Sequence, residues 1–348
     1  MALTQTQAAH TAEYSIGAGL QRKMKVILSR KGFDSCYGGY PSPILPDGRM
    51  ISLPIPSSED SICYKDLKIQ NKNLYELMRE LFDPKDRKTK IKINGKWTEL
   101  TEQTTCHLDP DIYHFLIDRD KEWTPLFGQC KAAQSHLENK NVTEGDLFLF
   151  FGSFRKTKYD RENESDGEGE GLGAKFRKTK YDRENRGKLG FDPEDREKHI
   201  IFGYFQIGKI IKVNEGTKLP RWMLYHPHTI RVRRKIRNNT IYVARKRLSW
   251  NSSLPGAYFF NYSKNLVLTK EGCPKSYWNL PTFFRNLEIS YHSNNSWKSD
   301  GTFKSAGRGQ EFVIEENEKV EEWAKNLIEE NFYNTDSDFP LSLTLRLK

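Results

Sequence analysis

Apolar residues gather along the chain in short runs that predict a β-sheet core. Two long runs, residues 145–152 and 199–213, concentrate aromatic and β-branched side chains, which are typical of buried strands. A shorter apolar run at residues 25–29 predicts another buried strand. Less regular runs predict further strands at residues 240–244, 265–269 and 311–314.

Helical periodicity appears in three segments. The first begins at Asn73, and apolar residues then recur at three- and four-residue intervals as far as Leu81. Glu76 stands three residues after Asn73, which is the spacing of a capping box. The other two helices are predicted over residues 129–137 and 318–330, where apolar positions again fall on one face.

A hairpin completes the predicted elements. The pair Asn94-Gly95 is favoured in two-residue turns, so residues 90–100 are expected to form two short antiparallel strands. Helices and strands are interspersed along the chain rather than alternating regularly. The expected fold class is therefore α+β, with a mixed sheet flanked by helices.

A duplicated segment lies between the two long strand-like runs. Residues 154–163 recur identically as residues 176–185, with a spacer rich in Gly and Glu between the copies. Each copy carries Arg and Lys and could bind anions, but neither has an apolar face to pack. We therefore favour a solvated loop over an anion-binding arm, and we expect this insert to be dispensable for folding.

The chain is expected to hold one domain that the insert interrupts. Residues 1–23 lack the apolar core of a secretory signal and are predicted to be a disordered extension. The two parts of the domain are predicted at residues 24–153 and 198–348, on either side of a low-complexity insert at residues 154–197. The second part carries a basic strand and the final helix.

The composition indicates which kinds of binding partner and which cellular compartment to expect. Lys and Arg outnumber Asp and Glu by 56 to 46, and the isoelectric point is about 9.1, which favours a polyanionic partner such as DNA or a nucleotide. The five cysteines are scattered without a CxxC pair, so a disulfide framework or zinc knuckle is not expected. No run approaches the about 18 apolar residues of a membrane span. We expect a cytoplasmic protein without a membrane partner.

The first segment that could carry chemistry is the loop after the first predicted strand, residues 29–43. Gly32 allows close backbone approach to a ligand, and Arg30 and Lys31 supply positive charge for a phosphate. Asp34 could act as an acid or base, or it could simply cap a turn. The loop matches neither a P-loop nor a dinucleotide fingerprint.

The second segment contains His107 and Asp109, the spacing of the His-x-Asp pair in iron/2-oxoglutarate oxygenases. On a strand both side chains would point to one side, as a shared metal ion requires. Alternatively, Asp109 caps a helix that has Pro110 at its first position. Because this short motif is common by chance, we predict no tightly bound iron or zinc. Candidates for a third metal ligand are His226, His228 and His292.

Two further segments offer groups that could contact a nucleobase. Gln129, Gln134 and His136 could read its hydrogen-bonding edge, or they could be polar positions on a helix. The segment of residues 307–311 places Arg308 between two glycines, followed by two polar residues. It could approach a ligand closely or form a plain hairpin turn. Its predicted ligand-binding residues are Arg308, Gln310 and Glu311.

The densest basic run flanks the strand predicted at residues 240–244. Alternation along a strand would place several of these side chains on one sheet face, where they could contact phosphates. The other interpretation is a solvated edge strand that its charges protect from aggregation. The predicted nucleic-acid contacts are Arg231, Arg233, Arg234, Lys235 and Arg237.

Several of these segments, in the same order, carry a resemblance to a known family that runs from Met24 to Ile314. They are residues 29–35, 41–49, 107–111, 127–129, 132–137, 145–152 and 308–313. The sequence resembles the nucleotide modification associated domain 3 family. Ser153, where relatives carry an aromatic residue, and the insert depart from the family pattern.

The resemblance implies a role in the DNA base hypermodification systems of phages and bacteria. We therefore expect a protein that binds, and helps to modify, a nucleobase or nucleotide, with other DNA-modification enzymes as further partners. The alternatives are a non-enzymatic reader of modified bases and an iron/2-oxoglutarate-type base oxygenase. The reaction and any cofactor are left open.

A second likeness concerns the two long strands. Residues 145–152 and 199–213 are similar to a strand pair of PUA-like and EVE-like barrels, which hold a modified base in an aromatic pocket. This likeness predicts a partly barrel-like sheet in which the insert joins two neighbouring strands.

The expected site lies where the opening loop, the His107 segment and the Arg308 loop meet. Arginine and lysine would hold phosphate, and the histidine and carboxylates would be acid, base or orienting groups. The predicted catalytic residues are Asp34, His107 and Asp109; the predicted ligand-binding residues are Arg30, Lys31, Gly32, Gln129, Gln134, His136, Arg308, Gln310 and Glu311.

Overall fold

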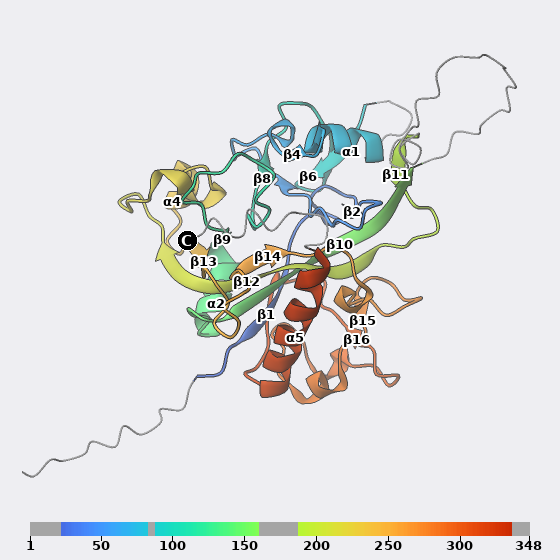
Figure 1. Ribbon diagram of the computed structural model, residues 1–348, viewed down its shortest axis with the longest axis vertical. Helices are drawn as coiled ribbons and strands as arrows, with labels where there is room; N and C mark the ends of the chain where they lie inside the picture. The colour runs from blue at the N-terminus through green and yellow to red at the C-terminus, as the bar shows by residue number, and fades with distance from the viewer. Residues whose placement is uncertain (1–21, 83–87, 160–186, 336–348) are drawn as a thin grey trace, which may run out of the picture.

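The computed structural model describes residues 22–82, 88–159 and 187–335. Its centre is a large mixed sheet, whose main path runs β17-β1-β10-β12-β13-β9, with β2, β11 and β14 attached beside it (Figure 1). The strands of this sheet are β1 (Val26–Arg30), β2 (Ser42–Ile44), β9 (Leu126–Gln129), β10 (Leu147–Tyr159), β11 (Leu189–Phe191), β12 (Lys198–Lys212), β13 (Thr240–Ala244), β14 (Ala257–Phe259) and β17 (Glu311–Val313).

Smaller elements surround the sheet. The two-stranded sheets pair β3 (Ile55–Pro56) with β8 (Cys106–His107), β4 (Lys68–Ile69) with β5 (Lys72–Asn73), β6 (Lys90–Ile93) with β7 (Lys96–Glu99), and β15 (Tyr277–Trp278) with β16 (Phe303–Lys304). The α-helices are α1 (Leu74–Phe82), α2 (Lys131–Asn139), α4 (Arg231–Arg234) and α5 (Glu318–Thr335). Short 3-10 turns include η3 (Pro227–Thr229) and η4 (Lys264–Leu266).

The sheet is mixed because β10, at its centre, has partners of both orientations. β10 runs parallel to β1 and β2 and antiparallel to β12 and β11. The paired stretches of β10 and β12 are buried on both faces, which explains why their sequences are almost continuously apolar. Aromatic rings such as Phe150, Phe202 and Phe205 fill the space between the sheet and its covering layers.

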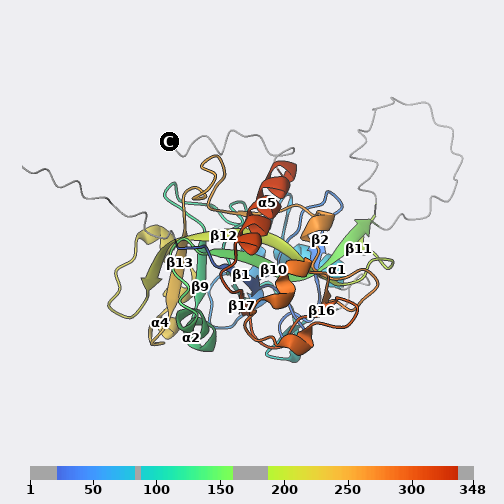
Figure 2. The same cartoon turned by 90° about the horizontal axis from the view of Figure 1, so that it is seen from below.

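Two layers cover the sheet. Figure 1 shows α5 on one side of β10 and β12, with α1, β4 and β6 on the other side, and in Figure 2 α5 again lies against the sheet. Helix α5 buries Val320, Ala324 and Ile328 against the core. The fold is therefore α+β, as predicted from the sequence. Among the described residues, no helix is both long and apolar enough to cross a membrane.

The sheet does not close into a barrel. Its main path ends at β17 and β9, each of which pairs with a single strand of the sheet. The likeness to PUA-like and EVE-like barrels is thus not confirmed, although β10 and β12 are neighbours as that likeness implied. The outer edge of β9 is therefore not paired with another strand of the sheet and can contact other parts of the chain.

Local signals in the sequence correspond closely to local structure. Asn73 caps α1, because its side chain accepts from the Glu76 backbone N–H at 3.0 Å while the Glu76 carboxylate accepts from the Asn73 N–H at 2.9 Å. Asn94 and Gly95 both have positive φ, as a type I′ hairpin turn requires. These elements are confirmed.

Three predicted boundaries are wrong. Residues 265–269 do not form a strand, since Lys264–Leu266 is a 3-10 turn, although Val267 and Thr269 make isolated bridges. The second helix begins at Lys131, because Gln129 is paired with Thr240 at the end of β9. The strand predicted at residues 145–152 continues as β10 to Tyr159.

The low-complexity insert spans fewer residues than the predicted range of 154–197. The first six residues of the first repeat copy belong to β10, where Phe154 is fully buried and pairs with Ser42 on one side and Lys198 on the other. The expectation that residues 154–159 lack a core role is therefore wrong. The second copy, residues 176–185, lies outside the described residues, and the dispensability of residues 160–186 stays a prediction.

We predict that Phe154→Ala lowers the free energy of unfolding by about 3–5 kcal/mol, because it removes a buried ring that packs 5.6 Å from the ring of Phe202. Lys158→Ala, on an exposed position of the same strand, should cost less than about 1 kcal/mol. Denaturant unfolding of both proteins measures the difference. Equal stabilities would show that this part of the repeat contributes nothing to the core.

Candidate functional site

The site is built along the outer edge of β9. After β8 ends at His107, the chain runs beside β9, and Asp111 makes a two-way backbone bridge with Leu126. Two residues further along the edge, the Gly128 N–H donates to the Asp109 carboxylate at 2.8 Å. No helix begins at Pro110, so the interpretation of Asp109 as a helix cap is wrong. An edge N–H fixes this carboxylate instead.

A histidine from a distant part of the chain lies against the same strand. His228, in the short turn η3, packs directly on Gly128: a Cβ added there would lie 2.2 Å from the imidazole ring. Only glycine leaves room for the ring. Beside it, His226 is fully buried with its Nε2 atom 3.3 Å from Asp109 Oδ1.

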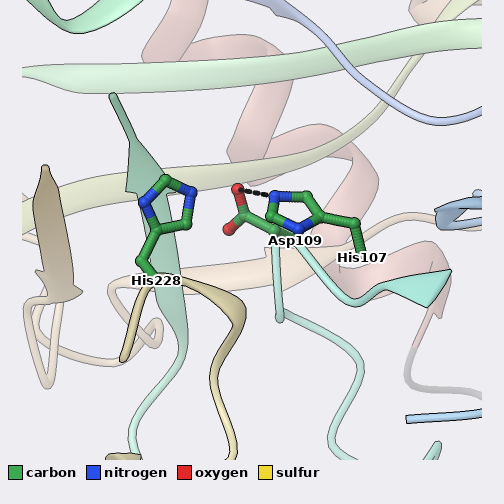
Figure 3. Close-up of side chains that lie close together, drawn as sticks. All are labelled: His107, Asp109 and His228. Carbon is green, nitrogen blue, oxygen red and sulfur yellow. Dashed lines mark ion pairs between the residues drawn. The ribbon is translucent and has the colours of Figure 1, made fainter. Parts of the chain in front are cut away.

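His107, Asp109 and His228 therefore meet at one point. Each contributes a potential metal-ligand atom, and these atoms all lie within 4.8 Å of one another. His107 Nε2 is 3.8 Å from Asp109 Oδ2. Figure 3 shows the carboxylate between the two imidazole rings, each of which comes from a different segment. Of the three distal histidines considered from the sequence, the structure brings His228 into this group, with His226 next to it.

In His107 and His228, the ring nitrogen that faces away from Asp109 is held by a second residue. His107 Nδ1 lies 3.0 Å from Asp60 Oδ2, and His228 Nδ1 lies 2.6 Å from Asn239 Oδ1. Because both partners offer an acceptor oxygen, each Nδ1 carries the proton and donates it. Each Nε2 then keeps its lone pair on the side of Asp109, which is the arrangement of histidines that bind metals.

A buried ion pair fixes Asp60 in turn. The guanidinium of Arg233 donates to both of its carboxylate oxygens, at 2.5 and 3.0 Å, and to the Pro227 carbonyl at 3.1 Å. Both side chains are almost fully buried. Burial alone would raise the pKa of Asp60, but the hydrogen bonds from His107 and Arg233 outweigh it and lower that pKa. Asp60 is therefore an anion that orients His107.

The electrostatics of the group favour an anionic Asp109 carboxylate beside a neutral His228 ring. Burial would raise the pKa of Asp109, but the neighbouring His226, His228 and His107 lower it overall. Burial lowers the pKa of His228 to about 3, although Asp109 acts in the opposite direction. An ionised Asp109 and a neutral His228 are the protonation states that a divalent cation requires of such ligands.

A second polar cluster lies across β9. Gln129 follows Gly128, so its side chain points to the opposite face, where its Nε2 donates to Glu311 Oε1 at 2.6 Å. Lys31 Nζ lies 2.7 Å from the same oxygen and 4.4 Å from the centre of the Phe127 ring. The Glu311 side chain is fully buried, and its Oε2 atom has no hydrogen-bond partner among the described residues.

The opening loop adjoins both clusters. Gly32 and Asp109 line the same small cavity, together with Ser52. Lys31 reaches Glu311, and the Arg30 guanidinium donates to the carbonyl oxygens of residues 306 and 307. The three segments expected to converge are thus neighbours. Their catalytic and ligand-binding roles stay predictions.

Some predicted site residues have structural partners of their own. Asp34 accepts from the backbone N–H groups of Cys36 and Tyr37, both at 2.7 Å, so its carboxylate caps a turn. Gln134 is buried and accepts from the Tyr242 hydroxyl at 2.9 Å. His136 lies 2.9 Å from the Ser290 hydroxyl. Arg308 and Gln310 are exposed.

The basic run is not an alternating strand. Residues 231–234 form the short helix α4, and the two middle arginines are used inside the protein. Arg233 binds Asp60, and Arg234 donates to the carbonyls of Thr229 and Thr217 at 2.7 and 2.8 Å. The predicted phosphate contact of Arg233 is therefore replaced by a role behind His107. The exposed members are Arg231, Lys235 and Arg237.

Asp60 and Asn239 were missed by the sequence analysis. Asp60 lies in an irregular polar segment, and Asn239 lies in a turn before β13, where such residues are ordinarily solvated. Their burial next to histidine is a tertiary effect. A buried arginine such as Arg233 requires a carboxylate partner, but its burial is itself visible only in the structure.

Fold and site together define an α+β protein with a His-Asp-His group at the open edge of a mixed sheet. The model of the family described as nucleotide modification associated domain 3 matches residues 25–315. The chain belongs to this family, as its sequence motifs indicated, and the family description implies involvement in nucleotide modification. No curated protein and no solved structure matches the chain.

We predict that Gly128→Ala displaces His228 and lowers the free energy of unfolding by about 1–3 kcal/mol, the usual cost of overpacking. Gly216→Ala is the matched control, because a Cβ there meets nothing nearer than 3.5 Å. Denaturant unfolding reports stability, and the imidazole NMR signals of His228 report displacement. If the two variants have the same stability and the same His228 signals, His228 does not pack on Gly128 of β9.

Proposed function

We propose that this protein is a metal-dependent enzyme that modifies a nucleobase in DNA, with His107, Asp109 and His228 as the metal ligands. The observation that carries the proposal is the meeting of these three side chains within 4.8 Å, at the edge of β9. Two histidines and one carboxylate are the ligand set of non-haem iron(II) oxygenases, which leave coordination positions open for substrates. The family supplies the link to nucleotides.

The surroundings of the three residues support a metal site over a plain hydrogen-bond network. Asp60 and Asn239 take the Nδ1 protons on the outside, at 3.0 and 2.6 Å. The two Nε2 atoms are thereby directed at a carboxylate to which neither ring can donate a proton. A cation between them would take the lone pairs of both Nε2 atoms together with the carboxylate.

The same geometry favours an enzyme over a reader of modified bases. A reader needs an aromatic cage and a basic rim, whereas an enzyme needs titratable groups that converge beside a space for substrate. Here His107, Asp109 and His228 converge, and a small cavity lined by Gly32 and Ser52 adjoins the carboxylate. A bound iron(II) ion would supply oxygen activation, and the buried pair of Asp60 and Arg233 would keep His107 in its ligating orientation.

We predict that the protein, purified without chelator and loaded anaerobically, binds about one iron(II) ion per chain. His107→Ala, Asp109→Ala and His228→Ala should each lower the affinity by at least about tenfold, because each removes one of only three protein ligands. Elemental analysis and isothermal titration measure the binding. The control is His136→Ala, a histidine held by Ser290 outside the group, which should bind normally.

Two outcomes would contradict this proposal at different levels. If no divalent ion binds better to the wild type than to the Asp109→Ala variant, the three residues are not a metal site, and the prediction from the sequence alone stands. If iron binds but mass spectrometry finds the same nucleosides in DNA from cells with and without the active gene, the metal site is real and the assignment to DNA modification is wrong.

The exposed end of the basic run would hold the DNA. Arg231 and Lys235 flank the buried Arg233, and Arg237 follows, so these cations surround the segment that leads away from His228. We predict that replacing all three exposed residues with Ala weakens binding to duplex DNA. The slope of the logarithm of the binding constant against the logarithm of the salt concentration should become shallower by up to about 3, one unit per lost phosphate contact.

A charge-matched control separates the effect of this surface on DNA binding from the effect of the overall charge of the protein. Replacing the exposed Lys90, Lys96 and Lys319 with Ala removes the same charge elsewhere. Fluorescence anisotropy over a range of salt concentrations gives both slopes. Equal losses in the two triple variants would mean that DNA is attracted by net charge alone and that α4 is not the contact surface.

A further inference from the structure

Tyr291 is held in an unfavourable backbone conformation with its ring on the surface. Its φ angle is +66°, a region that bulky residues rarely adopt, and 48% of the residue is exposed. Neither feature helps the core, because an exposed ring gains little from burial. Strain of this kind persists where the surrounding structure enforces it, and it is often associated with ligand contact.

The surroundings of Tyr291 fix its ring in place. The His136 ring lies 4.4 Å away, centre to centre, and His136 is itself held by the Ser290 hydroxyl at 2.9 Å. Ser290 in turn accepts from the Val313 N–H of β17 at 2.8 Å. Gly309 approaches so closely that a Cβ there would lie 2.9 Å from the Tyr291 ring. We call Tyr291, His136 and Gly309 the aromatic platform.

The platform is uncharged, and a cation stands beside it. Burial and the nearby Lys140 lower the pKa of His136, and burial raises the pKa of Tyr291, so both rings are neutral near pH 7. Arg308, next to Gly309, is exposed and forms no ion pair with any described carboxylate. A neutral ring pair with an adjacent free guanidinium matches a nucleotide, which offers a flat base and a negative phosphate.

The platform is continuous with the basic run through α2. Asn238, just beyond Arg237, accepts from the Lys131 N–H and donates to the Ser135 hydroxyl, both at 2.9 Å. The next residue of the helix is His136, whose ring packs on Tyr291. Figures 1 and 2 both place α4 and α2 at the same end of the sheet. A strand of nucleic acid lying along α4 would therefore reach the platform.

We propose that the aromatic platform binds an unpaired nucleotide of a nucleic-acid strand, with the base stacked on Tyr291 and Arg308 on a neighbouring phosphate. Paired bases cannot stack on a protein ring unless they leave the duplex, so the partner is single-stranded or locally opened. The inference goes beyond the metal centre and does not depend on it. It gives the protein a means of holding the opened strand on which a base-modifying enzyme must act.

The test uses the full chain, with EDTA present, and a fluorescein-labelled 15-nucleotide single strand of mixed sequence. Tyr291→Ala should weaken binding by about 5- to 100-fold, as expected when one stacked base is lost. Tyr291→Phe, which keeps the ring, should bind like the wild type. Tyr291→Asn removes the ring but tolerates positive φ, so it should show the same loss without a change in the thermal midpoint.

Trp97 provides the matched control. It is equally exposed, at 51%, but lies on the β6–β7 hairpin, so Trp97→Ala should leave the affinity unchanged. The blunt-ended duplex of the same sequence should bind Tyr291→Ala and wild-type protein alike.

Four results would overturn the proposal. They are unchanged single-strand binding by Tyr291→Asn, an equal loss in Trp97→Ala, a loss in Tyr291→Phe, and an equal loss for the duplex. The presence of EDTA makes the test independent of metal binding, so its failure would leave the metal-centre proposal intact, and failure of that proposal would leave this test valid.

Discussion

The unpaired edge of β9 is the constraint on which the site depends. Because no further strand of the sheet pairs there, the Gly128 N–H is free to hold Asp109, and Leu126 is free to bridge Asp111. The missing side chain of Gly128 leaves the room that His228 occupies. Alternation then directs Gln129 to the opposite face, where it meets Glu311. One short strand thus positions two polar clusters that come from five segments of the chain.

Buried charge holds this arrangement in one geometry. Asp60 and Arg233 are withdrawn from water, and breaking such a pair by removing one partner typically costs about 3–5 kcal/mol. Apolar residues of similar volume in place of Asp60 and Arg233 could make the fold equally stable, but they could not keep the proton of His107 on Nδ1. The placement of Arg233 in the basic run also means that one helical turn serves two purposes. The inner arginine holds Asp60 beside His107, while its neighbours Arg231 and Lys235 face solvent.

The sequence by itself determined the elements whose physics is local. The capping box of Asn73 and Glu76 and the turn of Asn94-Gly95 depend only on residues a few positions apart. The central strands were identifiable because burial on both faces requires continuous apolar runs. Family membership followed from ordered motifs. Where the local pattern was irregular or missing, as at residues 265–269 and 154–159, the predicted boundaries were wrong.

Only the tertiary structure decided which residues meet. The sequence offered three histidines as partners of His107 and Asp109, and nothing local distinguishes them; packing on a glycine at a sheet edge selected His228. The sequence likewise could not show that Arg233 turns inward to Asp60, that the Asp34 carboxylate accepts N–H groups of its own turn, or that the sheet stays open. These outcomes depend on contacts between segments far apart in the chain, whose energies no short window of sequence contains.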